Sequence, residues 1–319
     1  MIIVTGAAGF IGSNLVIKLN QILEDDIIVV DDINDPLKKQ NINNLRYNEL
    51  VGINDFWDWI LENKNKKIDT VIHLGACSDT LEKNTKFLYL NNVVYSQKLW
   101  HFAIEKKCKF IYASSAATYG DGSQGFSDDH NLVSQLHPLN DYGQSKQDFD
   151  LWVLDQTTAP RLWAGLKYFN VYGPGEAHKG RMASVVWHFI QQLKWERNIK
   201  LFDASHGFEA GEQKRDFIYI DDAVSMTIYI MLKDIKSGIY NIGTGTAQTF
   251  NDLAAVFIDN KLTDSVQFIP FPNDLNSNYQ AYTCADMIKL KSAGYNEEPI
   301  SLKKGIESYL SANTKVVNN

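Results

Sequence analysis

The feature that most constrains this chain is a set of three glycines close to its start. Gly6, Gly9 and Gly12 follow a short apolar run at residues 2–4 and precede a segment with helical spacing. In a strand–loop–helix unit, the first glycine permits the tight turn, the second lets the backbone approach a pyrophosphate, and the third lets the helix pack on the strand. Backbone amides at the start of that helix face the phosphates. The loop therefore predicts a dinucleotide-binding βαβ unit.

Apolar runs of strand length alternate with longer segments of helical period through the first half of the chain. The predicted strands are residues 2–4, 27–30, 71–74, 110–113 and 165–169, and the predicted helices are residues 11–23, 91–106 and 142–156. This alternation predicts an α/β fold of the Rossmann type, a doubly wound parallel sheet with helices on both faces.

The pattern becomes irregular after about residue 170, with a turn at 172–175, a helical segment at 183–193 and a loop at 206–213. We therefore expect a Rossmann domain over residues 1–170 and a smaller C-terminal substrate-binding lobe mainly over residues 171–319. Two later strands, at 217–220 and 239–242, are predicted to return to the main sheet, so that residues 217–245 rejoin the first domain.

Composition excludes several classes of protein. The net charge of −7 argues against nucleic-acid binding, which needs a basic face. The three cysteines lack CxxC spacing, and no histidine or carboxylate cluster is evident, so we predict no disulfide framework and no metal site. The chain lacks an apolar run long enough for a bilayer and the basic start of a signal peptide. These features predict no membrane association and a cytoplasmic location.

The charges near the second predicted strand leave the choice between NAD and NADP open. Asp31 and Asp32 end that strand about twenty residues after the glycine loop, where an acidic residue binds the ribose. Their carboxylates suit a free 2′-hydroxyl and repel a 2′-phosphate. Lys38 and Lys39 follow closely and would neutralise that phosphate.

The predicted chemical centre combines a phenol, an ammonium group and a serine pair. Tyr142 and Lys146 are four residues apart, so they lie on one face of a predicted helix. A phenol titrates near 10, and a nearby cation favours its ionised form, so we expect Lys146 to lower the pKa of Tyr142. Ser114 and Ser115 end the predicted strand at 110–113, where active sites of parallel sheets collect. A serine hydroxyl there would bind the reacting oxygen.

Together the glycine loop, the serine pair and the Tyr-x-x-x-Lys motif resemble the extended short-chain dehydrogenase/reductases, a family of sugar-nucleotide epimerases, dehydratases and reductases. The resemblance covers nearly the whole chain. Within the family, residues 75–78, 112–120 and 168–174 and the sequence His178-Lys179-Gly180 are similar to the 6-epimerases that act on an ADP-activated heptose. The resemblance implies an isomerase that uses NADP, with NAD also accommodated, and a homo-oligomer, a pentamer.

The resemblance also implies a two-base mechanism. Hydride leaves C6″ of ADP-D-glycero-D-manno-heptose, a 6″-ketone forms, and hydride returns to the other face to give the L-glycero epimer, which supplies heptose for the inner core of lipopolysaccharide. Because the oxygen is protonated from opposite sides in the two half-reactions, two bases are needed. Tyr142 and Lys179 match these bases, Ser115 holds the oxygen, and Lys146 positions the phenol and the cofactor.

Further site residues follow from local matches to the family. The predicted cofactor-binding residues are Gly6, Gly9, Phe10, Ile11, Gly12, Asp31, Asp32, Lys38, Leu74, Gly75, Ala76, Cys77, Ser78, Asn91, Lys146, Val171 and Lys179. The predicted substrate-binding residues are Asn170, Arg181, His188, Phe202, Asp203, Ala204, Ser205, Arg215 and Tyr279. Arg215 is the candidate for the substrate diphosphate, because a guanidinium bridges phosphate oxygens with paired hydrogen bonds.

Four features depart from the family pattern. Ile53 stands where relatives carry a cofactor-contacting lysine, Asp32 replaces an amide, Arg181 replaces a small hydroxyl residue, and the loop at 206–213 is longer. Two rival functions stay open. One is a 4-epimerase or dehydratase acting on another nucleotide sugar, although a dehydratase needs an Asp-Glu pair where Thr118-Tyr119-Gly120 stands. The other is a non-catalytic NAD(P)-sensing protein, which would be expected to lose Tyr142 or Lys146.

Overall fold

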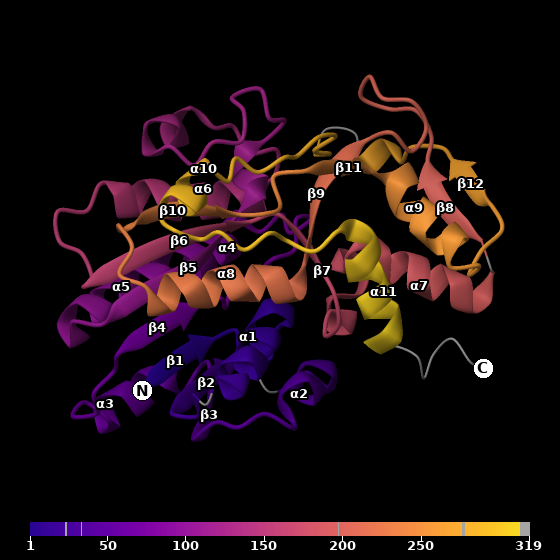
Figure 1. The fold of residues 1–319 in the computed structure, drawn as a ribbon. Coiled ribbons are helices and arrows are strands. Elements are labelled where there is room, and N and C mark those ends of the chain that lie inside the picture. Colours follow the sequence, from indigo (N-terminus) through magenta and orange to yellow (C-terminus); the bar gives the residue numbers. More distant parts are fainter. Residues whose placement is uncertain (23, 33, 197, 276–277, 313–319) are drawn as a thin grey trace.

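The computed structural model describes residues 1–22, 24–32, 34–196, 198–275 and 278–312. Its centre is a seven-stranded, wholly parallel sheet with the strand order β10-β6-β5-β4-β1-β2-β3 (Figure 1). The strands are β1 (Ile2–Thr5), β2 (Ile27–Asp31), β3 (Glu49–Gly52), β4 (Thr70–His73), β5 (Lys109–Ser115), β6 (Leu162–Tyr168) and β10 (Gly238–Ile242). The predicted α/β fold with a doubly wound parallel sheet is confirmed.

Helices surround this sheet and the smaller part of the molecule (Figure 1). They are α1 (Phe10–Gln21), α2 (Pro36–Ile42), α3 (Phe56–Glu62), α4 (Thr85–Leu88), α5 (Tyr95–Lys106), α6 (Asp141–Leu154), α7 (Val185–Trp195), α8 (Ile220–Leu232), α9 (Phe250–Asp259), α10 (Ile288–Ser292) and α11 (Leu302–Ala312). Five short 3-10 or π segments complete the set, and they are η1 (Tyr89–Val94), η2 (Ala116–Tyr119), η3 (His130–Gln135), η4 (Ala177–Met182) and η5 (Asn273–Leu275).

Alternate residues of the strands supply two hydrophobic cores, one on each face of the sheet. In β1, Val4 packs into the core that includes side chains of α1 and α8, whereas Ile3 packs into the core that includes side chains of α3, α5 and α6. Neighbouring side chains of a strand point to opposite faces, so a strand covered on both faces is apolar at most of its positions. This explains why β1 and β2 read as continuous apolar runs, both fully buried.

The rest of the chain forms two small sheets beside the main one. The first contains β7 (Asn170–Tyr172), β9 (Lys214–Tyr219) and β11 (Ala247–Thr249) in the order β11-β9-β7. The second pairs β8 (Ile199–Phe202) with β12 (Val266–Ile269) in parallel. Helices α7 and α9 lie beside these strands (Figure 1).

One of the two predicted returning strands joins the main sheet and the other does not. β10 pairs with β6 in parallel, as expected for residues 239–242. The prediction for residues 217–220 was wrong, because β9 pairs with β7 and β11 and the helix α8 begins at Ile220. β9 carries the buried carboxylate of Asp216, which accepts hydrogen bonds from backbone amides of Gly245 and Ala285. Those donors lie outside the main sheet, so they connect β9 to segments that do not belong to it.

Several element boundaries differ from the predictions. The first helix begins at Phe10 and ends at Gln21, and Leu23, its predicted last residue, lies outside the described residues. The helical segment predicted at 91–106 starts earlier, because α4 and η1 lead directly into α5. The edge strand β3 was not predicted. Of its four residues Glu49 is exposed, Leu50 and Gly52 are half-buried and only Val51 is buried, so β3 lacks the apolar run of the central strands. Within the described ranges, no helix has both the length and the apolar character needed to cross a membrane.

Candidate active site

The predicted site residues gather at the carboxyl ends of four neighbouring strands. The glycine loop follows β1, Asp31 ends β2, residues 74–78 follow β4, and Ser115 ends β5. These strands lie side by side in the order β5-β4-β1-β2. Since parallel strands present their carboxyl ends at one edge of a sheet, the fold brings together segments that are more than a hundred residues apart in the sequence.

The glycine loop has the geometry that a dinucleotide requires. Gly6 has φ of +70°, and a Cβ atom there would lie 2.5 Å from the backbone nitrogen of Gly75. A Cβ atom at Gly12 would overlap the carbonyl oxygen of Gly6. Helix α1 begins directly after Gly9, and no side chain caps its first turn, so the amides of Phe10 and Ile11 are suited to binding an anion. The loop therefore fits a pyrophosphate.

Asp31 is buried and connects the glycine loop to Lys38. Its Oδ2 accepts a hydrogen bond from the Ala8 amide at 2.8 Å, and its Oδ1 lies 3.2 Å from the ammonium nitrogen of Lys38. Asp32 is exposed, and its Oδ1 accepts from the amide of Asn34. The carboxylate of Asp31 thus braces the loop and holds the lysine at the ribose end of the predicted cofactor site.

A buried side chain that sequence reasoning missed holds the loop after β4. This loop contains the predicted cofactor residues Leu74, Gly75, Ala76, Cys77 and Ser78. Asn92, in η1, accepts from the Cys77 amide at 2.9 Å and donates to the Cys77 carbonyl at 3.0 Å. Its Nδ2 also lies 2.9 Å from Oγ of Ser145 in α6. The predicted neighbour Asn91 is only partly buried, and it contacts the Asn92 side chain at 3.4 Å. The sequence could have indicated Asn92 only as a polar residue within a segment of predicted helix.

Tyr142 and Lys146 lie on α6, beside the end of β5. The Tyr142 hydroxyl is hydrogen-bonded to the Ser115 side chain. The ammonium of Lys146 donates to the Ala113 carbonyl at 2.8 Å and lies 6.0 Å from the centre of the Tyr142 ring. The structure therefore brings Ser115, Tyr142 and Lys146 together, as the sequence predicted.

The electrostatics of these groups differ from the expectation. Burial raises the pKa of Tyr142, and the hydrogen bond with the Ser115 side chain opposes that rise without cancelling it. Burial also lowers the pKa of Lys146 to about 8, against the charge of Asp150. The prediction that Lys146 lowers the pKa of Tyr142 is therefore not what this structure displays.

Lys179 lies in η4, next to the glycine loop. Its ammonium nitrogen is 5.6 Å from the centre of the Phe10 ring. Burial lowers the pKa of Lys179, and the Glu176 carboxylate opposes that effect. Among the residues that the structure describes, Lys179 makes no ion pair and no direct contact with Tyr142. The side chains of Thr80 and Met182, 3.6 Å apart, join η4 to the loop after β4.

A cavity of about 210 Å³ extends from the serine motif towards the smaller sheets. Its lining residues come from both parts of the molecule, and they are Thr80, Ala117, Gly120, Leu139, Asn140, Asn170, Arg215, Leu275, Asn278, Tyr279 and Gln280. Three of them, Asn170, Arg215 and Tyr279, are predicted substrate residues. Arg215 is buried, with its guanidinium 4.7 Å from the Tyr279 ring centre and 5.8 Å from the Phe250 ring centre. The sequence did not indicate Gln280, whose amide donates to the carbonyls of Ala116 and Gly120.

The other predicted substrate residues do not line this cavity. Arg181 and His188 lie near each other, with His188 Nε2 3.3 Å from the Arg181 carbonyl. Phe202 ends β8 and residues 203–205 follow it, and the Phe202 ring packs against Phe271 at 5.1 Å. Asp203 Oδ1 accepts from the Ala204 amide, and Ser205 pairs with Phe208 in a short turn. Val171, a predicted cofactor residue, lies in β7 opposite Ile218.

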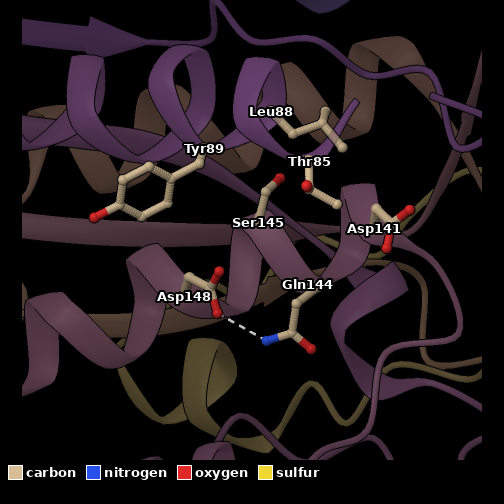
Figure 2. A pocket seen from close by; sticks show the side chains of 7 residues that line it. All are labelled: Thr85, Leu88, Tyr89, Asp141, Gln144, Ser145 and Asp148. Carbon is tan, nitrogen blue, oxygen red and sulfur yellow. Dashed lines mark hydrogen bonds between the residues drawn. The ribbon is translucent and has the colours of Figure 1, made fainter. Parts of the chain in front are cut away.

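A second, smaller cavity of about 70 Å³ lies between α4 and α6 (Figure 2). Its lining residues are Thr85, Leu88, Tyr89, Asp141, Gln144, Ser145 and Asp148. Gln144 donates to Asp148 at 2.7 Å across its rim. Since its lining contains two acids and no base, this cavity is not suited to a nucleotide diphosphate.

Comparison with known proteins agrees with this geometry. The model of the NAD dependent epimerase/dehydratase family matches residues 2–243. The ADP-L-glycero-D-manno-heptose-6-epimerase of Fusobacterium nucleatum is 46% identical to this chain, with 97% of each chain covered. The crystal structure of the Helicobacter pylori ADP-L-glycero-D-manno-heptose-6-epimerase superposes with a TM-score of 0.82 at 29% identity, covering 98% of this chain and 95% of the other.

A further solved structure is the UDP-glucuronic acid 4-epimerase of Bacillus cereus, in complex with UDP-glucuronic acid and NAD. It superposes with a TM-score of 0.80 at 25% identity, covering 98% of this chain and 99% of the other. The family match extends over more than half of the chain, from the glycine loop to the end of β10. This chain therefore belongs to the NAD-dependent epimerase/dehydratase family.

Proposed function

We propose that this protein converts ADP-D-glycero-D-manno-heptose to its L-glycero epimer through a transient 6″-ketone and so supplies heptose for the inner core of lipopolysaccharide. The observation that carries the proposal is a second amine beside the glycine loop, Lys179, in addition to the hydrogen-bonded pair Tyr142 and Ser115. The near full-length relationship to the Fusobacterium nucleatum epimerase supports this substrate.

In the proposed mechanism the chain's own side chains manage the proton at the substrate oxygen. The Ser115 hydroxyl holds the C6″ oxygen, and either Tyr142 or Lys179 takes its proton. After the sugar presents its other face, the second of these groups returns a proton from the opposite side. A nicotinamide dinucleotide, when bound, supplies the removal and return of hydride at C6″. Lys146 orients the bound ribose beside the phenol.

The substrate diphosphate is proposed to bind at Arg215. Burial lowers the pKa of its guanidinium, but an arginine stays charged at any physiological pH. Tyr279 and Phe250 flank the group and fix its plane, which suits paired hydrogen bonds to phosphate oxygens. Asn170 and Gln280 line the same cavity nearer to the serine motif and are proposed to contact the sugar.

The preferred cofactor is proposed to be NADP, with NAD as the weaker ligand. The support is the ion pair between Lys38 and Asp31, which reduces the repulsion that a carboxylate would exert on a 2′-phosphate. Replacing Lys38 with methionine is expected to weaken NADP binding by about tenfold while leaving NAD binding nearly unchanged, because one charged contact contributes about 1.5 kcal/mol. Equal loss for both dinucleotides would contradict this preference.

We further propose a cytoplasmic homo-oligomer, a pentamer. Phe87, Tyr89 and Leu90, on α4 and η1, are each 45–51% exposed, which supports burial against another copy of the chain. Light scattering after gel filtration measures the mass directly. A monomeric mass at micromolar concentration would contradict the oligomer without affecting the proposed reaction.

The decisive experiment incubates the purified protein with ADP-D-glycero-D-manno-heptose and separates the two C6″ epimers by chromatography. Assays run without added cofactor and with NADP⁺ or NAD⁺. Tyr142→Phe and Lys179→Met are expected to lower the rate by about 10²–10⁴-fold, the usual contribution of a positioned acid or base. Lys194→Met, at an exposed lysine near the end of α7, is the control and keeps wild-type activity. No conversion under any cofactor condition would overturn the heptose assignment.

A further inference from the structure

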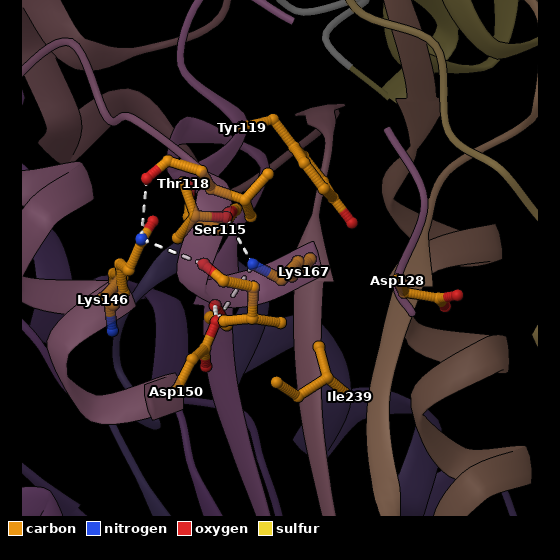
Figure 3. A network of polar contacts seen from close by, with 12 residues as sticks. Ser115, Thr118, Tyr119, Asp128, Lys146, Asp150, Lys167 and Ile239 are labelled. Atoms are coloured by element: carbon orange, nitrogen blue, oxygen red, sulfur yellow. Dashed lines mark hydrogen bonds and ion pairs between the residues drawn. The ribbon is translucent and has the colours of Figure 1, made fainter. Parts of the chain in front are cut away.

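A fully buried ion pair lies next to the proposed catalytic groups (Figure 3). The ammonium of Lys167, in β6, is 3.1 Å from Oδ2 of Asp150, in α6, and both side chains are 0% exposed. Neither residue lines the substrate cavity. Neither is among the residues that the family resemblance assigns to the cofactor or the substrate.

The carboxylate of Asp150 holds the strand that ends in Ser115. Its Oδ1 accepts from the Tyr112 hydroxyl at 3.0 Å, and its Oδ2 accepts from the Ser114 hydroxyl at 2.7 Å. Ser114 lies directly opposite Lys167 in the register of β5 and β6. The carboxylate of Asp150 therefore connects α6, β5 and β6 next to Ser115, the serine that is proposed to hold the substrate oxygen.

The lysine of the pair extends this connection to Ser115 itself. Its ammonium donates to the Thr118 hydroxyl, and that hydroxyl donates to the Ser115 carbonyl at 2.8 Å. The same ammonium lies 4.8 Å from the centre of the Tyr119 ring. A chain of polar contacts thus runs from Asp150 through Lys167 and Thr118 to the backbone of Ser115 (Figure 3).

Asp150 also acts on Lys146, one helical turn earlier in α6. Burial lowers the pKa of Lys146 to about 8, and the negative charge of Asp150 is the main influence that opposes this effect. The other groups that face the Lys146 ammonium are the Ala113 carbonyl, the Tyr142 ring, the Cys77 thiol and the His73 imidazole. Of Asp150 and the four groups just named, Asp150 alone carries a carboxylate.

Stability alone does not account for such a pair. Removing two charges from water costs free energy that their attraction barely repays, and apolar replacements of similar volume are often neutral or stabilising. A buried pair that is kept within bonding distance of the catalytic strand indicates a second role.

We propose that Asp150 and Lys167 are positioning residues for the catalytic centre. Lys167 fixes the Ser115 backbone through Thr118, and Asp150 supplies the charge that Lys146 faces. This inference rests on the proposed roles of Ser115 and Lys146 in the epimerase reaction. Neither Asp150 nor Lys167 touches the substrate.

The test compares Asp150→Asn, Lys167→Met, the double variant and Lys167→Arg. Each single neutralisation leaves a buried charge without its partner, so both are expected to lower the melting temperature. The double variant removes both charges, so its melting temperature is expected to return towards that of wild type. Its kcat is nevertheless expected to stay about 10–100-fold below wild type, because small displacements of reacting groups have effects of that size. Its KM should change little, and Lys167→Arg should recover part of the rate.

Lys109→Met is the matched control. Lys109 is also a buried lysine of the sheet, but it lies at the start of β5, where its ammonium donates to the Met231 carbonyl. Its loss is expected to lower the melting temperature without lowering kcat. A double variant whose kcat matches wild type, with an unchanged pH profile, would overturn the proposal and leave a purely structural pair.

A readout that does not depend on turnover separates this inference from the proposed function. The Lys146 amine is titrated by NMR in protein labelled with ¹³C-lysine, with its signal assigned from its absence in Lys146→Met. The titration midpoint is expected to be lower in Asp150→Asn than in wild type, because the negative charge of Asp150 raises the pKa of Lys146. Equal midpoints would overturn the electrostatic part, even if the protein acts on a different sugar.

Discussion

The Asn92 side chain closes a ring of two hydrogen bonds with the backbone of Cys77, at 2.9 and 3.0 Å. Asn92 lies in a π-helical turn between two α-helices, and Cys77 lies in the loop that follows β4. The ring replaces the regular backbone pairing that this loop lacks, so the loop keeps one shape beside the glycine loop.

Replacing Asn92 with leucine is expected to weaken dinucleotide binding. The substitution leaves the half-buried amide and carbonyl of Cys77 without their partner, and an unsatisfied group costs up to about 1–3 kcal/mol when it is fully buried. Isothermal titration with NADP and urea unfolding measure the two effects. Asn91→Ala, one residue earlier and partly exposed, is the comparison. If Asn91→Ala weakened dinucleotide binding more than Asn92→Leu, then Asn91, the residue predicted from the sequence, would contribute more to cofactor binding than Asn92.

Gly6→Ala is expected to destabilise the fold more than Gly125→Ala does. Both glycines have positive φ, +70° and +74°, so both alanines suffer the same backbone strain. A Cβ atom at Gly6 also meets the backbone of Gly75, whereas Gly125 has nothing within 4 Å. The difference in the free energy of unfolding should be about 1–3 kcal/mol, the usual effect of overpacking, and urea titration measures it. Equal losses in the free energy of unfolding of the two variants would show that backbone strain alone accounts for the effect.

Arg215→Lys is expected to raise KM for the nucleotide sugar by about 10–100-fold with little change in kcat. Lysine keeps the charge but loses the planar fork and its stacking on Tyr279, and a hydrogen bond to a charged group contributes about 1.5–3 kcal/mol. Steady-state kinetics separate the two constants. The control is Arg46→Lys, at an exposed ion pair with Asp25. A fall in kcat at constant KM would assign Arg215 to the chemical step instead.

The stability of the protein should depend on pH through His73. Burial lowers the pKa of its imidazole to about 3, and the ring contacts Thr5 and Ser96 at 2.6 and 2.9 Å. Below pH 6.5 an unfolded histidine binds a proton that the folded one does not. Stability is therefore lost as the pH falls from 6.5 towards 3, by about 1.4 kcal/mol per unit.

The measurement is the difference in free energy of unfolding between wild type and His73→Gln, from pH 7.5 to pH 5. The difference is needed because Asp128, whose pKa burial raises to about 6, contributes in the opposite direction. Wild type should lose stability relative to the variant only below pH 6.5. Parallel curves across the whole range would contradict a neutral, buried His73.

The central sheet could be predicted from the sequence because its inner strands contain runs of consecutive apolar residues, such as Ile2 to Val4 in β1 and Ile27 to Val30 in β2. The apolar runs of β1 and β2 can be recognised without knowing which strands lie beside them in the sheet. β3 could not be found in this way, since one buried residue, Val51, gives no periodicity. The partner of β9 was also out of reach, because pairing between distant strands depends on contacts such as those of Asp216, which no local pattern contains.

The residues of the candidate site also divide into those that the sequence indicates and those that only the structure shows. Gly6, Tyr142 and Lys146 belong to motifs with fixed spacing, so local sequence indicates them. Asn92 and the pair Asp150 and Lys167 act through partners 15 to 53 residues away and belong to no short motif. The pKa of Tyr142 could not be read from its distance along the helix to Lys146, because burial is the largest influence on it.

The position of β10 has a consequence for how the protein is made. β10 covers the outer side of β6, yet it follows β7, β8 and β9 in the chain. During synthesis the ribosome must release the chain up to Ile242 before β6, a largely buried strand of 7 residues, gains its second neighbour. Until then β6 is an open edge that other chains can pair with. A fragment that ends near residue 170 should therefore aggregate, and this protein should fold cooperatively only after its synthesis has passed Ile242.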